Sequence, residues 1–164
     1  MRYKVAIAGA GVGGLTAAAY LARAGHDVEI FDKFDAPAPV GSGLIVQPVG
    51  QRVLDDLDAL GCTLQLGVKV TSMVGYEVDH GRKVLDVSYG KGFGLAIHRA
   101  SLFEVLLNAA RSAGAKLNTK AEVKEFDGQH VVARTGRHGP FDLIINASGA
   151  NSGCLLYTSD AADE

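Results

Sequence analysis

A glycine-rich turn lies between an apolar segment and a helical pattern at the start of the chain, and it constrains the fold more than any other feature. Residues 3–8 have the pattern of a short buried strand. Residues 13–24 carry apolar side chains at helical spacing, and Gly25 follows where a helix cap belongs. Residues 28–32 then read as a second strand. A strand, a helix and a strand within about 30 residues predict a βαβ unit with a parallel pair of strands.

The turn reads GAGVGG over residues 9–14, a G-x-G-x-x-G pattern that follows a strand and opens a helix. Gly9 permits a tight turn, Gly11 lets a pyrophosphate approach the backbone, and Gly14 lets helix and strand pack closely. The free N–H groups and the partial positive charge of the helix N-terminus favour phosphate binding. The pattern therefore predicts a dinucleotide site, although it does not separate NAD from FAD.

An acidic side chain, Asp32, ends the second strand about 20 residues after the glycine turn, where it can accept hydrogen bonds from ribose hydroxyls. Its negative charge would repel a 2′-phosphate, which disfavours NADP at this site. The alternative is a glycine turn followed by a solvated acid with no ligand. That alternative requires the strand, the helix and the acid to coincide by chance, so dinucleotide binding is the stronger interpretation.

The composition excludes several other classes of protein. Sixteen basic and 18 acidic side chains nearly balance, and the sequence contains no block of basic residues that could bind nucleic-acid phosphates. Two cysteines are too few for a disulfide framework, and no apolar run reaches the roughly 18 residues of a membrane span. The five histidines show no metal-ligand spacing. We therefore expect a cytoplasmic protein with no nucleic-acid partner, no membrane span and no metal.

The middle of the chain predicts a loop, a helix and a hairpin. Residues 33–48 are rich in proline and glycine and predict a long loop. Residues 51–60 predict a helix that ends at Gly61. Residues 69–78 and 83–88 predict two strands joined by a turn.

The last third predicts one helix and several strands. Ser101 and Glu104 form a capping box, which indicates a helix beginning there and continuing to Gly114. A buried parallel strand is expected at residues 143–145. Other short strands are expected at residues 116–118, 123–126 and 130–134, the last two joined as a hairpin.

In their order and spacing, these segments resemble the flavoprotein monooxygenases of the aromatic-ring hydroxylase type, related to para-hydroxybenzoate hydroxylase and the ubiquinone-biosynthesis hydroxylases. The resemblance covers nearly all of residues 3–153. It rests on the glycine turn, Asp32-Lys33, GSGL at 41–44 followed by Pro48 and a helix, HRASL at 98–102, and DLIINASGANS at 142–152.

This resemblance implies a fold and a domain organisation. The fold is of the α/β class: a Rossmann-like FAD-binding fold, truncated, in which a βαβ unit with a parallel sheet is joined by an antiparallel β-meander. Residues 1–153 would be the N-terminal part of an FAD-binding domain. Within them, about residues 65–92 would belong to the start of the substrate-domain sheet.

The resemblance also implies roles at matching positions. The glycine turn would surround the FAD pyrophosphate, Asp32 would hold the adenosine ribose, and the backbone at Val123 would face the adenine. Arg99 would reach the phosphate and ribityl region, where a guanidinium is a good forked donor, and Gly43 would lie near the flavin. The alternatives are that Val123 is an ordinary strand residue, that Arg99 is a surface arginine, and that Gly43 belongs to a plain turn. The predicted cofactor-binding set is Gly9, Gly11, Val12, Gly13, Gly14, Asp32, Lys33, Gly43, Arg99, Val123, Ser148 and Gly149.

One position departs from the family pattern. The family commonly has Asp-Gly where this chain has Ser148-Gly149, and that aspartate supports the cofactor and is linked to nicotinamide handling. Serine can form hydrogen bonds but carries no charge. Related reductases and halogenases resemble this chain in having Ser-Gly or Thr-Gly there. FAD is expected in either case, but the serine leaves the hydroxylase and these relatives as alternatives.

The last residues break the pattern. Residues 154–164 (CLLYTSDAADE) resemble the translation of a sequencing adapter, with a genuine short helix as the alternative. We therefore expect the native sequence to end near residue 153, at the front part of a longer enzyme.

The predicted activity belongs to that longer parent. It would use FAD, NAD(P)H as a transient reductant and O₂ to hydroxylate a small aromatic substrate, while the fragment itself would be inactive. No catalytic residue is named, because the substrate-facing part is mostly absent. The alternatives are an FAD-dependent reductase or halogenase, a non-catalytic dinucleotide-binding fragment, and an NAD-dependent dehydrogenase.

Overall fold

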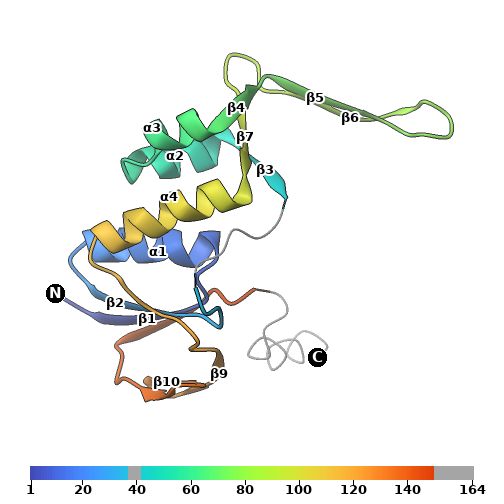
Figure 1. Cartoon of the computed structure of the whole chain (residues 1–164). Helices are drawn as coiled ribbons and strands as arrows, with labels where there is room; N and C mark the ends of the chain where they lie inside the picture. Colours follow the sequence, from blue (N-terminus) through green and yellow to red (C-terminus); the bar gives the residue numbers. More distant parts are fainter. Residues whose placement is uncertain (37–41, 150–164) are drawn as a thin grey trace, which may run out of the picture. The chain divides into compact units, whose positions relative to one another are not determined.

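The computed structural model describes residues 1–36 and 42–149, and its chain divides into two compact units (Figure 1). The first unit comprises Met1–Ala38 and Leu106–Glu164, and the second comprises Pro39–Val105. Residues 150–164, which include the expected adapter-like tail, lie outside the described residues, as do residues 37–41 of the expected loop.

A four-stranded parallel sheet forms the centre of the first unit. Strand β1 (Lys4–Ala8) pairs with β2 (Asp27–Phe31) on one side and with β12 (Leu143–Asn146) on the other, and β8 (Lys116–Asn118) pairs with β2. Helix α1 (Val12–Arg23) connects β1 to β2 and packs against both. The predicted βαβ unit and its parallel strands are confirmed.

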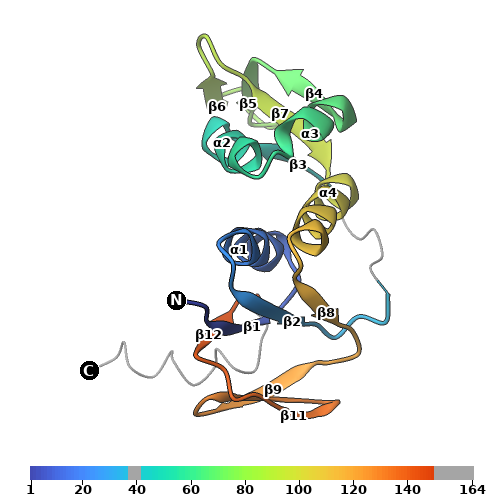
Figure 2. The ribbon, with the colours of Figure 1, turned by 90° about the vertical axis from the view of Figure 1, so that its left-hand side faces the viewer.

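An antiparallel meander forms the second layer of this unit. Strands β9 (Val123–Asp127), β10 (His130–Ala133) and β11 (Gly136–His138) pair in sequence order. Figure 2 shows α1 on one face of the parallel sheet and the meander on the other. The buried cluster between the two sheets consists of Ala6, Phe31, Ala121, Val131, Ala133 and Phe141. The Rossmann-like fold with an added β-meander is therefore present.

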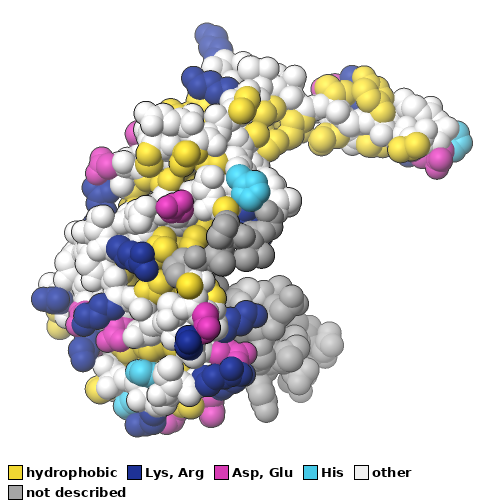
Figure 3. Space-filling view, in the orientation of Figure 1, with side chains coloured by type: hydrophobic (Ala, Val, Ile, Leu, Met, Phe, Trp, Pro, Cys, Tyr) yellow, Lys and Arg dark blue, Asp and Glu magenta, His cyan; other side chains and the backbone are white. Residues whose placement is uncertain are grey.

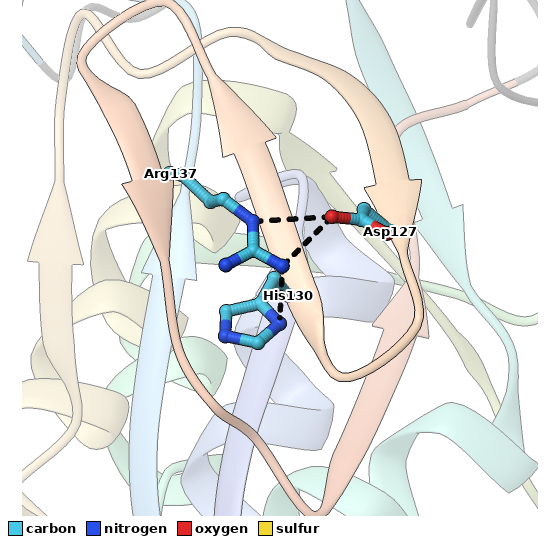
Figure 4. A network of polar contacts seen from close by, with 3 residues as sticks. All are labelled: Asp127, His130 and Arg137. Carbon is cyan, nitrogen blue, oxygen red and sulfur yellow. Dashed lines mark hydrogen bonds and ion pairs between the residues drawn. The ribbon is translucent and has the colours of Figure 1, made fainter.

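A polar network ties the three meander strands together on their exposed surface (Figure 4). Arg137 on β11 donates from Nε and Nη2 to one carboxylate oxygen of Asp127 on β9, at 3.1 and 2.8 Å. The same Nη2 lies 3.0 Å from Nδ1 of His130 on β10. Because Arg137 and Asp127 are exposed and His130 is half-buried, the network stabilises the meander only weakly.

The second unit contains a small antiparallel sheet, two helices and a two-stranded ribbon. The sheet has the order β3 (Gly43–Val46), β7 (Gly94–His98), β4 (Gly67–Val70). Helices α2 (Pro48–Asp56) and α3 (Leu60–Leu66) pack against it. The ribbon consists of β5 (Ser72–Tyr76) and β6 (Lys83–Ser88), and α4 (Arg99–Ser112) contributes residues to both units.

The two faces of the β3-β7-β4 sheet differ. Val46, Leu95 and Ile97 are buried on one face. On the other face, Ile45, Ala96 and Val68 are register partners that line an open apolar groove. Exposed apolar side chains continue along the ribbon, where Figure 3 shows yellow atoms. They include Val74, Tyr76, Val84 and Leu85.

Three expectations about the second unit are wrong. The expected loop over 33–48 contains β3 and the start of α2, because the proline and glycine signals flank an apolar stretch that pairs with β7. The expected helix over 51–60 ends at Asp56, and Gly61 lies inside α3, because the chain turns instead at Asp58, whose φ is 56°. The expected strand over 69–78 is divided into β4 and β5.

The expected start of α4 is also wrong. The helix begins at Arg99, so Ser101 lies within it and is not the N-cap. The His98 ring takes the capping position, because its Nδ1 accepts a hydrogen bond from the Ala100 N–H at 3.3 Å. The hydroxyl of a capping box is therefore replaced by an imidazole.

Among residues 1–36 and 42–149, none of the helices combines the length and the apolar character needed to cross a membrane.

Candidate functional site

The carboxyl ends of the parallel strands place several predicted residues at one edge of the first unit. Gly9 follows β1, Asp32 follows β2 and Ala147 follows β12. The chain passes from β1 to β2 on one side and reaches β12, on the other side of β1, only much later. In open parallel sheets, ligands bind outside the carboxyl ends at such a reversal of strand order. This edge is the candidate site.

Two glycines of the turn are required by the packing of the chain itself. Gly9 has a φ of +102°, and a Cβ there would lie 2.7 Å from the Cα of Ser148. A Cβ on Gly14 would overlap the carbonyl oxygen of Gly9 and lie 3.1 Å from its carbon. Real Cβ atoms do not approach backbone so closely, so the tight turn and the close helix–strand packing expected from the pattern are both present.

The other two glycines have no such internal reason. A Cβ on Gly11 or Gly13 would meet no atom of the described residues within 4 Å. Gly11 is the N-cap of α1, no side chain from residues 1–36 or 42–149 caps this helix, and its first turn contains no acidic residue. The N–H groups of Val12 and Gly13 therefore have no partner within the helix. Open space beside free donors fits an anionic ligand such as a pyrophosphate.

Asp32 reaches back to the glycine turn. One of its carboxylate oxygens accepts a hydrogen bond from the Ala10 N–H at 2.5 Å, and the other accepts one from the Phe34 N–H at 3.4 Å. Because a carboxylate has about four lone-pair sites, it keeps acceptor capacity for ribose hydroxyls. The sequence did not predict that Asp32 also orients the backbone of the turn.

The segment that leads to Val123 runs beside Asp32. The Ala121 N–H donates to the Asp32 carbonyl at 2.8 Å, two residues before Val123 begins β9. The partly exposed carboxylate of Glu122 accepts a hydrogen bond from Lys124, which lowers its pKa, and the charges of Arg134 and Lys33 lower it further. Lys33 is exposed and contributes positive charge at this edge.

The turn after β12 brings Ser148 against the glycine turn. The last ladder bond runs from the Ala147 N–H to the Ala8 carbonyl at 2.8 Å. Beyond it, the Asn146 side-chain oxygen accepts hydrogen bonds from the Ser148 N–H, at 3.2 Å, and from the Ser148 hydroxyl. Gly149 follows with a φ of +85°. Asparagine at the end of a strand is a known turn signal, so Asn146 could have been singled out from the sequence.

Gly43 and Arg99 belong to the second unit, where Gly43 begins β3 and Arg99 begins α4 directly after β7. Gly43 is the register partner of His98, and the Arg99 N–H donates to the Ser42 carbonyl at 3.4 Å. The His98 cap holds the start of α4 at Arg99. The other predicted residues, Gly9, Gly11, Val12, Gly13, Gly14, Asp32, Lys33, Val123, Ser148 and Gly149, lie in the first unit.

Within the described part of the chain, no three His, Cys, Asp or Glu side chains form a group that could hold a metal ion.

The comparison with protein families matches residues 2–153 to the model described as "FAD binding domain". The chain belongs to this FAD-binding family. FAD is therefore the dinucleotide of the family, and the glycine turn is part of a domain that binds it.

The most similar proteins include named monooxygenases and hydroxylases. The FAD-dependent monooxygenase opaC of Aspergillus ustus is 35% identical over 160 residues, which cover 90% of this chain and 34% of that protein. Hispidin-3-hydroxylase of Neonothopanus nambi is 32% identical over 162 residues, which cover 90% of this chain and 38% of that protein.

Solved structures share the fold. The tetrameric form of 2-methyl-3-hydroxypyridine-5-carboxylic acid oxygenase has a TM-score of 0.83 and 28% identity, covering 93% of this chain and 41% of that one. The flavin-dependent monooxygenase PieE, in complex with FAD and substrate, has a TM-score of 0.75 at 22% identity, covering 97% of this chain and 32% of that one. The chain thus spans well under half the length of these relatives.

Proposed function

We propose that this chain binds the adenosine-diphosphate half of FAD and belongs to a monooxygenase that hydroxylates a small aromatic substrate. The observation that carries the proposal is the glycine turn at the reversal of strand order, where Gly11 and Gly13 leave open space beside free helix N–H groups. The family match over residues 2–153 supports FAD as the occupant.

The proposed roles in the first unit follow the geometry of the edge. Val12 and Gly13 donate backbone hydrogen bonds to the pyrophosphate, and Gly9 and Gly14 shape the turn. Asp32 accepts hydrogen bonds from the adenosine ribose while it holds the Ala10 N–H.

Other residues extend the contact with FAD. Val123 offers its backbone to the adenine, Lys33 adds positive charge, and Ser148 and Gly149 border the pyrophosphate. In the second unit, Arg99 and Gly43 serve the phosphate–ribityl and flavin regions. Bound FAD supplies the redox chemistry, with NAD(P)H as the reductant, and the chain binds and orients it.

The proposed domain organisation assigns residues 1–153 to the FAD-binding domain and about 65–92 to the start of the substrate-domain sheet. The β5–β6 ribbon supports the second assignment. A two-stranded ribbon is only marginally stable alone, and this one exposes Val74, Tyr76 and Val84. Residues 154–164 remain proposed as a non-native tail.

A titration of the purified chain with FAD, ADP and NAD by calorimetry tests the cofactor assignment. We expect FAD and ADP to bind and to raise the melting temperature, and NAD to bind more weakly. Stabilisation by NAD but not by FAD would instead support a dehydrogenase. No binding of any of the three would reject the proposal for this chain.

The neutral Ser148 favours a second candidate, an FAD-dependent reductase or halogenase. Oxygen consumption by the full-length parent separates the hydroxylase from the reductase. We expect substrate to stimulate consumption of both NAD(P)H and O₂. Turnover of substrate without O₂ consumption would favour the reductase.

A further inference from the structure

The turn after β12 is held by a side chain and not by the sheet. Strand pairing ends with the Ala147 N–H bond to Ala8. Ser148 lies one residue further, and its N–H and hydroxyl both donate to the side-chain oxygen of Asn146. Asn146 and Ser148 are both exposed, so packing does not fix their positions.

The turn after β12 lies directly against the glycine turn at Gly9. The atoms that a Cβ on Gly9 would meet are the Ala147 carbonyl group and the Cα of Ser148, the latter at 2.7 Å. A displacement of Ser148 therefore changes the space directly beside Gly9. The position of Ser148 beside Gly9 therefore depends on the side-chain oxygen of Asn146 as hydrogen-bond acceptor.

The hydrogen bonds also determine how Ser148 meets a ligand. A serine hydroxyl has one proton to donate and two lone pairs that accept. Because its proton is directed to Asn146, the Ser148 oxygen can meet a ligand only as an acceptor. It suits a sugar or ribityl hydroxyl, and as a neutral group it does not repel a pyrophosphate.

We propose that Asn146 is a positioning residue for FAD binding, which holds Ser148 against the glycine turn and presents its hydroxyl oxygen to the ligand as an acceptor. The inference rests on the proposed function of this edge. It adds a residue whose side chain acts through Ser148 and not by direct contact.

Two variants of the 164-residue chain distinguish the effect of the hydrogen-bond acceptor at position 146 from the effect of side-chain size. Asn146→Leu removes the acceptor at similar volume, and Asn146→Asp keeps it. Asn118→Leu is the matched control, because Asn118 also ends a strand of the same sheet but bonds Glu29 at 3.3 Å.

Amide hydrogen exchange without ligand is the first measurement. We expect the Ser148 amide to exchange faster in Asn146→Leu and to keep its protection in Asn146→Asp and Asn118→Leu. Lost protection in Asn146→Asp, or unchanged protection in Asn146→Leu, would overturn the acceptor role.

Calorimetric titration with FAD is the second measurement. We expect Asn146→Leu to bind FAD roughly tenfold more weakly, since one or two hydrogen bonds of ordinary strength are lost, and Asn118→Leu to bind as the parent chain does. Equal losses in both leucine variants, or none in Asn146→Leu, would reject the inference alone. A parent chain that binds no FAD would reject the proposed function as well.

Discussion

At the residue scale, the four glycines of the turn fall into two classes with different consequences for substitution. Gly9 and Gly14 face backbone atoms of the chain itself, whereas Gly11 and Gly13 face open space. The pattern in the sequence treats them alike. Only the structure separates the glycines that the fold requires from those that we propose a ligand requires.

Gly11→Ala and Gly14→Ala test this separation. Gly11 has a φ of −71°, which alanine adopts freely, so Gly11→Ala should lower the free energy of unfolding by no more than about 1 kcal/mol while it weakens FAD binding at least about tenfold. Gly14→Ala should destabilise the fold by about 3 kcal/mol or more, because its Cβ collides with the Gly9 carbonyl. Urea unfolding and FAD titration measure the two effects, and a similar loss of stability in both variants would contradict the distinction.

Glu122 offers a pH-dependent prediction at the same scale. Its lowered pKa means that the folded state favours the carboxylate, so its contribution to stability is complete above the ordinary glutamate pKa and is lost as the pH falls through the lowered value. Lys124→Ala should raise the pKa of Glu122 towards its ordinary value, which NMR of the side-chain carboxyl carbon can follow. Added salt should reduce the difference, because the carboxylate is partly exposed to solvent. A pKa that Lys124→Ala leaves unchanged would refute the assigned cause.

At the element scale, the start of α4 depends on an imidazole. Ser101 and Glu104 make a valid capping box in the sequence, but the helix begins two residues earlier and His98 accepts the Ala100 N–H bond. Histidine is not among the preferred caps, so local rules could not find it. The register of β7 against β3, which involves residues far apart in sequence, places His98 there.

His98→Ala should lower the free energy of unfolding by about 1 kcal/mol, the usual cost of a lost helix cap. His98→Asn should restore the stability, because the asparagine oxygen can accept the same bond. Denaturant unfolding of the two variants measures the difference. Equal destabilisation by both would show that the ring packs and does not cap.

The elements that could be predicted are those that local signals define. The βαβ unit, β8, the 123–134 hairpin and β12 follow from periodicity and from glycine turns. Strand β3 was missed, because its four residues form a strand only by pairing with β7, far along the chain. The break at Asp58 was missed as well, since a positive φ at an aspartate has no periodic signature.

The residues of the candidate site that belong to a sequence motif could be predicted, whereas its tertiary hydrogen bonds could not. Gly9 to Gly14 and Asp32 were found from their pattern and spacing. The Ala10 bond to Asp32 and the Asn146 bonds to Ser148 join segments or side chains whose geometry only the folded chain defines. The roles of Arg99, Gly43 and Val123 towards the cofactor stay predictions.

At the scale of the whole molecule, the second unit exposes apolar side chains on the ribbon that the rest of the described chain does not cover. Val84 on β6 is 60% exposed. Val84→Lys should therefore reduce binding of the dye ANS and reduce light scattering of the purified chain, because charged residues on exposed strands oppose edge-to-edge association.

Ser88→Lys is the matched control for this prediction. It adds the same charge to the same strand at an exposed position, without removing apolar surface. We expect a smaller decrease in ANS fluorescence than for Val84→Lys. Equal decreases would show that charge alone, and not the apolar surface, controls the association.

The order of strands in the parallel sheet has a consequence for how the chain folds. The Lys4 N–H binds the Asp142 carboxylate across 138 positions of sequence, and β12 is the second neighbour of β1. During synthesis, β1 and β2 emerge early, yet their sheet is completed only after residue 146, when the whole second unit has already left the ribosome. Strand pairs between residues so far apart in sequence form slowly, so the second unit can fold first. During that time the apolar strands of the first 36 residues have unpaired edges. The stage of folding that is most open to aggregation is therefore set by the position of β12 in the sequence.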